Sequence, residues 1–343
     1  MMVSVDNRPK VLLVDDEPAN LQVLRHVLQD GHRLLFARDG EKALALAQLE
    51  RPDLILLDIM MPNMTGYEVC RVLKQDARTV SIPVIFVTAL ADDSDEAQGF
   101  DLGAVDYITK PISPMIVRAR VRTHLSLVRA EELRLTRLQI VQRLGMAAEY
   151  KDNETGLHVI RMSHFSRILA LAAGFHGARA DDLLHAAPMH DVGKIGIPDA
   201  ILQKPGPLTA QEWQVMRGHP NIGAEIIGGC EVGLLNMAHC VALTHHEKWD
   251  GSGYPRGLQG ADIPVEGRIV AIADVFDALT SERPYKAAWT VEAALEMITA
   301  QAGHHFDPEL VSLFLARMPE ILAVKDRWME RADRLQVSAR VVA

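Results

Sequence analysis

Five short apolar runs recur along the first 110 residues, and they restrict what this part of the chain can fold into. Each run is nearly continuous rather than alternating, and stretches of helical spacing separate the runs. Continuous apolar strands are typical of a parallel sheet that helices cover on both faces. The sequence therefore predicts a doubly wound α/β domain of five parallel strands over residues 8–125. The runs occupy residues 11–14, 34–36, 54–57, 84–87 and 105–108.

Polar residues stand where these runs end. Asp15 and Asp16 follow the first run, and Asp58 follows the third. Because the carboxyl ends of parallel strands meet at one edge of the sheet, we expect these carboxylates to converge, and a hard cation such as Mg²⁺ would relieve their repulsion. Thr88 and Lys110, after the fourth and fifth runs, offer a hydroxyl and an ammonium group to phosphoryl oxygens. The chemistry indicated is phosphoryl transfer to Asp58.

This segment resembles the flavodoxin-like receiver domains of two-component response regulators. The resemblance rests on the motifs DDEP (15–18), DIMMPNMTG (58–66), VTA (87–89) and DYITKP (106–111). It implies that Asp58 accepts a phosphoryl group from a cognate sensor histidine kinase, and that Tyr107 reorients on activation. It also implies that Mg²⁺ is held by Asp15, Asp16, Asp58 and the backbone carbonyl of Met60, and that Thr88 and Lys110 contact the phosphoryl group.

A long helical connector is expected over residues 113–150, continuing the last receiver helix. Residues 115–148 contain no proline, and the first glycine after residue 115 is Gly145. The apolar residues of this stretch recur at threes, fours and sevens, which is a heptad-like seam. We expect this helix to pair with its twin in a parallel homodimer; a single helix packed on its own domains is the alternative. The seam residues are Val121, Leu125, Val128, Leu135, Leu138 and Val141.

Residues 150–320 carry helical spacing without a convincing strand pattern, so we predict an all-α domain followed by a tail at 321–343. Three histidines precede residue 150, at 26, 32 and 124, so eleven of the fourteen follow it. Their neighbours include carboxylates, and imidazole with carboxylate oxygen is a ligand set for divalent metals. The candidate ligands are Glu154, His158, His190, Asp191, His219, His245, His246 and Asp274.

Eight ligands are too many for one site and suit two or three ions bridged by Asp191. His190 with Asp191, and His245 with His246, are adjacent pairs whose side chains diverge by about 100° on a helix. We therefore expect the two members of the second pair to serve different ions. The absence of thiolates favours Fe or Mn, with Zn or Ni as alternatives.

The same region, residues 146–315, resembles the HD-GYP family of HD-type phosphohydrolases. The resemblance rests on DNETGLH (152–158), HDVGKIGIP (190–198), KPG (204–206), His219, HHEKWDGSGYP (245–255), DVFDAL (274–279) and RPYK (283–286). It implies hydrolysis of cyclic di-GMP through pGpG to GMP, and the presence of Glu154 favours three ions over two. It also implies that Asp191 and Lys194 are catalytic residues, and that Lys194, Arg283 and Lys286 bind phosphate. Gly253 and Tyr254 would lie in a substrate-side loop, which Glu247 and Asp250 would support.

The combined prediction is a response regulator whose cyclic di-GMP phosphodiesterase output is controlled by phosphorylation of Asp58. One alternative is a non-catalytic module that senses a cyclic dinucleotide or docks diguanylate cyclases through the Tyr254 loop. Another is a hydrolase of a related cyclic dinucleotide. A net charge of −9 gives no support to direct DNA binding. Three scattered cysteines and the lack of a membrane-length apolar run fit a cytoplasmic protein without a membrane segment.

Overall fold

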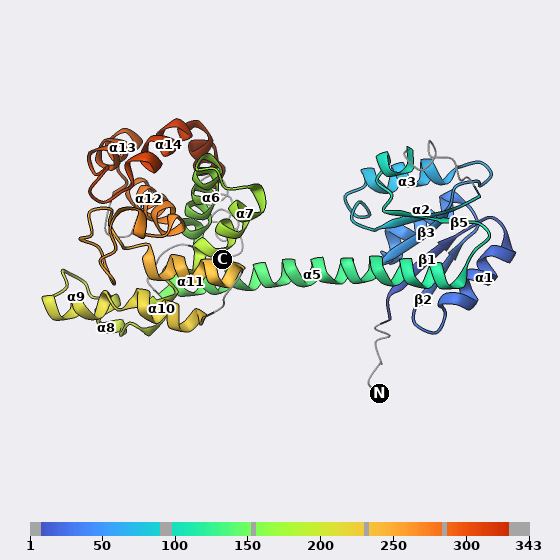
Figure 1. Ribbon diagram of the computed structural model, residues 1–343, viewed down its shortest axis with the longest axis horizontal. Coiled ribbons are helices and arrows are strands. Elements are labelled where there is room, and N and C mark those ends of the chain that lie inside the picture. The colour runs from blue at the N-terminus through green and yellow to red at the C-terminus, as the bar shows by residue number, and fades with distance from the viewer. Residues whose placement is uncertain (1–7, 90–97, 152–155, 230–232, 283–286, 329–343) are drawn as a thin grey trace, which may run out of the picture. The chain divides into compact units, whose positions relative to one another are not determined.

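The computed structural model describes residues 8–89, 98–151, 156–229, 233–282 and 287–328 (Figure 1). It divides into two compact units, Met1–Leu135 and Thr136–Ala343. None of the helices in these described ranges is long and apolar enough to cross a membrane.

The first unit is built on the predicted five-stranded parallel sheet. Its strands have the order β2-β1-β3-β4-β5, so the order reverses between β1 and β3 and a crevice opens at their carboxyl ends. The fifth strand begins one residue later than the predicted run. The strands are β1 Lys10–Val14, β2 Arg33–Ala37, β3 Leu54–Asp58, β4 Val84–Thr88 and β5 Asp106–Thr109.

Two apolar layers cover this sheet, because successive side chains of a strand point to opposite faces. Leu12, Ile55 and Leu57 pack with α2 (Gly40–Glu50) and α3 (Gly66–Gln75). On the other face, side chains of β1 and β3 pack with α1 (Pro18–Leu28) and the first turns of α5 (Pro114–Lys151). Figure 1 shows the two helix pairs on opposite faces. Burial on both faces explains why the runs are continuously apolar.

The connector forms helix α5, Pro114–Lys151, close to its predicted range. Its predicted seam is largely used within the chain itself. Val121 and Leu125 belong to the core of the receiver sheet, and Val141 packs in an apolar cluster of the second unit. Leu138 is also buried, whereas Leu135 is 47% exposed. The buried residues are not available to a second copy, so pairing with a twin stays a prediction and would need other residues of the helix.

The second unit is helical, and its described residues include no strand longer than an isolated bridge. Phe165, Phe276 and Phe314 lie in its main core, where α6, α12 and α14 meet. Short 3-10 turns, labelled η, join several helices. The elements are α6 Gly156–Ala172, α7 Gly177–Ala186, η1 Ala187–Met189, η2 Val192–Gly196, α8 Asp199–Leu202, α9 Ala210–Met216, α10 His219–Ile227, α11 Leu234–Thr244, η3 Gly260–Asp262, α12 Val265–Thr280, α13 Val291–Ala300 and α14 Pro308–Ala316.

The helical unit extends beyond the predicted limit at residue 320. Residues 318–328 form a further helix, in which Ile321 is fully buried in the main core. Lys325 donates a hydrogen bond of 2.6 Å to the carbonyl of Thr280 at the end of α12. The predicted tail is therefore wrong for residues 321–328, which belong to the domain, while residues 329–343 lie outside the described residues.

Candidate active site

The receiver carboxylates converge at the carboxyl end of the sheet, as the strand pattern predicts. Asp15, Asp16 and Asp58 each offer an oxygen, and these three atoms lie within 4.8 Å of one another. The Lys110 Nζ lies 2.9 Å from Oδ2 of both Asp15 and Asp58. Burial raises the pKa of Asp58, and Lys110 offsets this only in part. Three acidic oxygens around one point fit a hard cation, which would stabilise the charged form of Asp58.

The remaining predicted receiver residues lie around this cluster. Thr88 is buried at the end of β4, and the backbone N–H of Met60 donates to Oδ1 of Asp58 at 3.4 Å. Tyr107 is 5% exposed and packs between Phe86 and Phe100. The aromatic ring is therefore in a buried position in this structure.

In the helical unit, two short turns carry the central pair. His190 directly follows η1, and Asp191 immediately precedes η2. Gly193 allows η2 to close on the start of α10, because a Cβ atom there would lie 1.8 Å from the carbonyl oxygen of His219. This close approach puts Oδ1 of Asp191 3.1 Å from Nε2 of His219 and 3.4 Å from Nε2 of His245.

The same kind of hydrogen bond, from Nδ1–H to a backbone carbonyl, orients three of these histidines. The Nδ1–H groups of His190, His219 and His245 each donate to a backbone carbonyl three or four residues earlier, at 3.0, 2.8 and 3.1 Å. This hydrogen bond fixes the tautomer and leaves Nε2 as the free ligand atom. Each Nε2 atom faces a carboxylate oxygen of Asp191. The arrangement suits bridging by Asp191.

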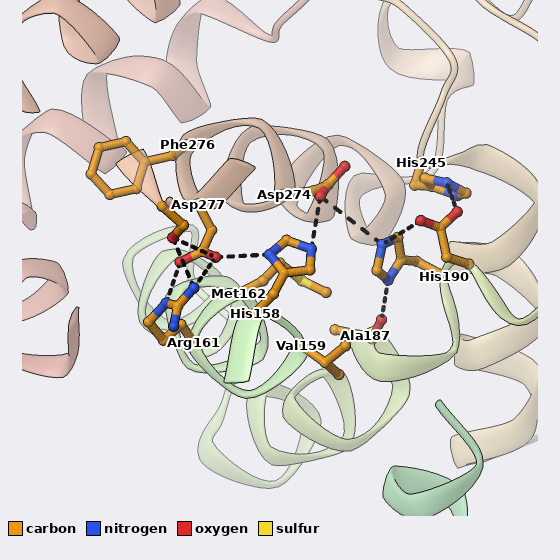
Figure 2. A network of polar contacts seen from close by, with 12 residues as sticks. His158, Val159, Arg161, Met162, Ala187, His190, His245, Asp274, Phe276 and Asp277 are labelled. Atoms are coloured by element: carbon orange, nitrogen blue, oxygen red, sulfur yellow. Dashed lines mark hydrogen bonds and ion pairs between the residues drawn. The ribbon is translucent and has the colours of Figure 1, made fainter. Parts of the chain in front are cut away.

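His158 is held by a carboxylate that the sequence analysis did not assign to the site. Its Nδ1 lies 2.7 Å from Oδ2 of Asp277. The Arg161 guanidinium donates to the same carboxylate, from Nε to Oδ1 and from Nη2 to Oδ2, both at 2.7 Å. The opposite nitrogen, Nε2, lies 3.3 Å from Oδ1 of Asp274 (Figure 2). His158 and Arg161, and likewise Asp274 and Asp277, are three residues apart on their helices and share a face. That spacing was the available signal for Asp277.

The predicted ligands form overlapping groups whose ligand atoms lie within 4.8 Å. One group contains Asp191, His219, His245 and His246, and another contains His158, His190 and Asp274. A third contains His190, Asp191 and Glu149, a residue that the sequence analysis missed. Seven of the eight predicted ligands are therefore together, and Glu154 lies outside the described residues.

His245 and His246 lie close together at the end of α11. Both fall in the group around Asp191, and their ring centroids are 4.0 Å apart. Helix α11 ends at Thr244, with His245 as its C-cap. That the two histidines serve different ions stays a prediction.

The electrostatics of the cluster fit divalent cations. Burial lowers the pKa of His245 and His246, which favours the neutral, ligating form. Burial also disfavours the charged form of His190, but Asp191 outweighs this and raises its pKa to about 9. His190 Nε2 and Asp191 Oδ1 are buried and lack a hydrogen bond among the described residues. A metal ion would satisfy both atoms and take the place of the proton.

Lys194 and the Gly-Tyr-Pro loop border the cluster. The Lys194 Nζ lies 2.8 Å from Oδ2 of Asp191. The ring of Tyr254 stacks on His246 with centroids 4.8 Å apart, and the Arg217 guanidinium lies 5.4 Å from the Tyr254 centroid. Arg217, like Asp277 and Glu149, was not assigned to the site from the sequence, since it belongs to no motif used there.

Backbone contacts fix the shape of this loop. Glu247 is 2% exposed and accepts from the backbone N–H groups of residues 256 and 258, at 2.7 and 3.0 Å. Asp250 accepts from the N–H of Ser252 at 2.9 Å. Gly253 permits a close approach, because a Cβ atom there would lie 2.2 Å from the Lys248 nitrogen. The predicted phosphate-binding residues Arg283 and Lys286 lie outside the described residues.

Comparison with known proteins supports both halves of this picture. Residues 11–122 match the model of the response regulator receiver domain, and residues 146–310 match an HD domain model. A Vibrio cholerae protein named "Probable cyclic di-GMP phosphodiesterase" is 39% identical over 95% of this chain and 81% of its own length. The "Cyclic di-GMP phosphodiesterase response regulator RpfG" of Xanthomonas campestris pv. campestris is 40% identical over 89% of this chain and 86% of its own.

A further relative matches a smaller share of the chain. The Vibrio cholerae "3'3'-cGAMP-specific phosphodiesterase 2" is 49% identical over 57% of this chain and 37% of its own length. The two matches that span nearly the whole chain carry the assignment, because they include both the receiver and the HD domain. The chain is thus a response regulator with an HD output domain, and it belongs to the same family as these two relatives, which are named cyclic di-GMP phosphodiesterases.

Proposed function

We propose that this protein hydrolyses cyclic di-GMP at the metal centre of its helical unit, under the control of phosphorylation at Asp58. The observation that carries the proposal is that seven predicted ligands lie in adjoining groups around Asp191 and His190, two of the seven. Oδ1 of Asp191 and Nε2 of His190 are buried and lack hydrogen-bond partners among the described residues. The names of the relatives that span both domains supply the substrate class.

The centre would hold two or three divalent ions, with Fe or Mn favoured because no thiolate is among the ligands. Asp191 would bridge, and the other ligands would be His158, His190, His219, His245, His246, Asp274 and Glu154. When bound, such ions supply an activated water and positive charge for the non-bridging oxygens of a phosphodiester.

The side chains around the centre bind and orient the substrate. Lys194 places an ammonium group beside Asp191, where it contacts a scissile phosphate or the leaving oxygen. Tyr254 offers a ring to a guanine base at the loop, and Gly253 allows the loop backbone to approach closely. Arg217, above the Tyr254 ring, offers a cation for a second phosphate, and we assign the same role to Arg283 and Lys286.

Phosphorylation would act through the receiver cluster. The carboxylates of Asp15 and Asp16 would bind Mg²⁺ beside Asp58, with the carbonyl of Met60 as a further ligand. Thr88 and Lys110 would contact the phosphoryl group and so report it to the rest of the domain. The donor would be a sensor histidine kinase in the cytoplasm, and a homodimer and docking of diguanylate cyclases by the Tyr254 loop are further parts of this proposal.

A second candidate is hydrolysis of a mixed cyclic dinucleotide. It is favoured by the relative named 3'3'-cGAMP-specific phosphodiesterase 2, which is 49% identical over 57% of this chain, whereas the two relatives that match over 95% and 89% of the chain are 39% and 40% identical. The two substrates differ in one base, so the discrimination would lie in the groups that contact the bases rather than in the metal ligands.

The test is anaerobic purification with metal analysis, followed by chromatography of the products from cyclic di-GMP and from 3'3'-cGAMP. We expect bound metal, conversion of cyclic di-GMP to pGpG and GMP, and loss of both metal and turnover in Asp191→Ala. An Asp191→Ala protein with full metal content and turnover would contradict the proposal. Faster turnover of 3'3'-cGAMP than of cyclic di-GMP would make 3'3'-cGAMP the preferred substrate and would leave the proposed metal site unchanged.

A further inference from the structure

Glu149 is the most unusual buried group of the helical unit. It lies near the end of α5, and only 1% of the residue is exposed. Both of its carboxylate oxygens are buried, and neither has a hydrogen-bond partner among the described residues. A carboxylate that is removed from water without a partner carries a large desolvation penalty. A compensating interaction for Glu149 is therefore expected.

The packing of α5 directs this carboxylate at the central pair of the cluster. Gly145 lets the helix lie against η1, because a Cβ atom at this position would be 2.3 Å from the carbonyl oxygen of Pro188. Glu149 follows one turn later, so it shares that face of the helix. Its carboxylate, His190 and Asp191 each offer one ligand atom, and the three atoms lie within 4.8 Å of one another.

Protonation of Glu149 would remove its charge but would not supply hydrogen-bond partners for its two oxygens. Burial raises its pKa, and the negative charge of Asp191 acts in the same direction. A neutral carboxyl group still has an O–H donor and a carbonyl acceptor, and the described residues offer a hydrogen-bond partner to neither oxygen. A divalent cation would instead be coordinated by the carboxylate of Glu149 together with Nε2 of His190 and Oδ1 of Asp191, which also have no hydrogen-bond partner in the described part of the chain.

We propose that Glu149 is a metal ligand of this centre, at a position that it shares with His190 and Asp191. The inference rests on the proposed function only in that the centre holds divalent ions. It adds a ligand from α5 to the set predicted from the sequence, and it is independent of the part that Glu154 plays. It also ties the last turns of the connecting helix to the metal content of the site.

The experiment compares Glu149→Gln, which keeps the size of the side chain and removes its charge, with Glu131→Gln. Glu131 is an exposed residue of the same helix, and its partner within the described part of the chain is Arg134, so it controls for the loss of one charge. The full-length proteins are stripped of metal, loaded anaerobically with Mn²⁺ and freed of excess metal. Two quantities are measured: Mn²⁺ per chain, and the shift in thermal unfolding midpoint that Mn²⁺ produces.

We expect wild type and Glu131→Gln to bind the same amount of Mn²⁺. Glu149→Gln should bind about one equivalent less, or bind its weakest ion at least about ten-fold more weakly, with a smaller shift in midpoint. Without metal, Glu149→Gln should be at least as stable as wild type, because it removes a buried carboxylate beside Asp191. Glu149→Ala is measured alongside, so that the result does not depend on the folding of one variant.

Unchanged Mn²⁺ content and an unchanged midpoint shift in either folded variant would overturn the proposal. A wild-type protein that binds no divalent ion would refute the proposed function instead, and with it the premise of this inference. The two failures are distinguishable because the first appears only in the comparison of variants and the second appears already in the wild type.

Discussion

Asp277→Asn tests whether the carboxylate behind His158 has the role that its contacts indicate. Asp277 is fully buried and accepts hydrogen bonds from His158 and from two nitrogens of Arg161, all at 2.7 Å. The change leaves the Arg161 charge buried without its counter-ion, which typically costs about 3–5 kcal/mol. For a unit of this size, that free energy corresponds to a fall of roughly 6–20 °C in the unfolding midpoint.

The same change should weaken metal binding, because an imidazole whose Nδ1–H loses a carboxylate is a poorer and less ordered ligand. A loss of about 10–100-fold in affinity is expected for such a partner. The two effects separate in the double variant Arg161→Met with Asp277→Leu. It replaces the buried ion pair by apolar side chains, so it should recover much of the stability and none of the metal affinity.

The assay is thermal unfolding of the metal-free full-length protein, followed by Mn²⁺ titration. The transition of the helical unit is identified as the one that Mn²⁺ shifts. Asp181→Asn is the matched control: Asp181 also pairs with an arginine, Arg167, at 2.6 Å, but half of its side chain is exposed. Such a pair contributes about 0–1 kcal/mol. If Asp277→Asn changes stability and metal affinity no more than the control does, the reasoning is refuted.

Three further predictions follow from single contacts. Gly193→Ala should destabilise the helical unit and reduce its metal content, as measured by thermal unfolding and metal analysis, because the new Cβ meets the backbone of α10. Gly177→Ala, where nothing lies within 4 Å of the new Cβ, should be close to neutral in both assays. Burial, with the nearby Lys248 charge, lowers the pKa of His305 to about 4, so the unfolded chain binds this proton first as the pH falls. Stability should therefore decrease from about pH 6.5 towards 4, and less steeply in His305→Asn; equal slopes in metal-free unfolding curves would count against this. Leu133 and Ile140 are 50% and 53% exposed on α5, so their joint change to Asp should weaken a homodimer in sedimentation experiments without unfolding either unit; an unaltered dimer would remove this helix face from the interface.

The sequence by itself determined the architecture and predicted most of the residues that converge in the candidate metal centre. Burial on both faces leaves a direct record in the continuous apolar runs, and the receiver carboxylates had to converge because parallel strands end at one edge. In the helical unit, the adjacent pairs at 190–191 and 245–246 marked the centre without knowledge of the fold. Whether a side chain can bind a metal depends on its residue type, so candidate ligands can be identified from the sequence.

Only the tertiary structure decided which further residues contact the predicted ligands. Glu149 belongs to no motif that the sequence analysis used, and it reaches the centre because Gly145 lets α5 approach η1. Asp277 is visible as a support only once α6 and α12 are known to face each other.

The connecting helix shows the same limit. Periodicity alone predicts that one face of α5 is apolar, but it does not say what covers that face. Val121 and Leu125 are covered by the sheet of the receiver itself, and Val141 by the helical unit. Apolar spacing is the same for a contact within a chain and for a contact between copies, because both bury the same kind of surface. The sequence therefore determines that a residue is buried, and the fold determines its partner.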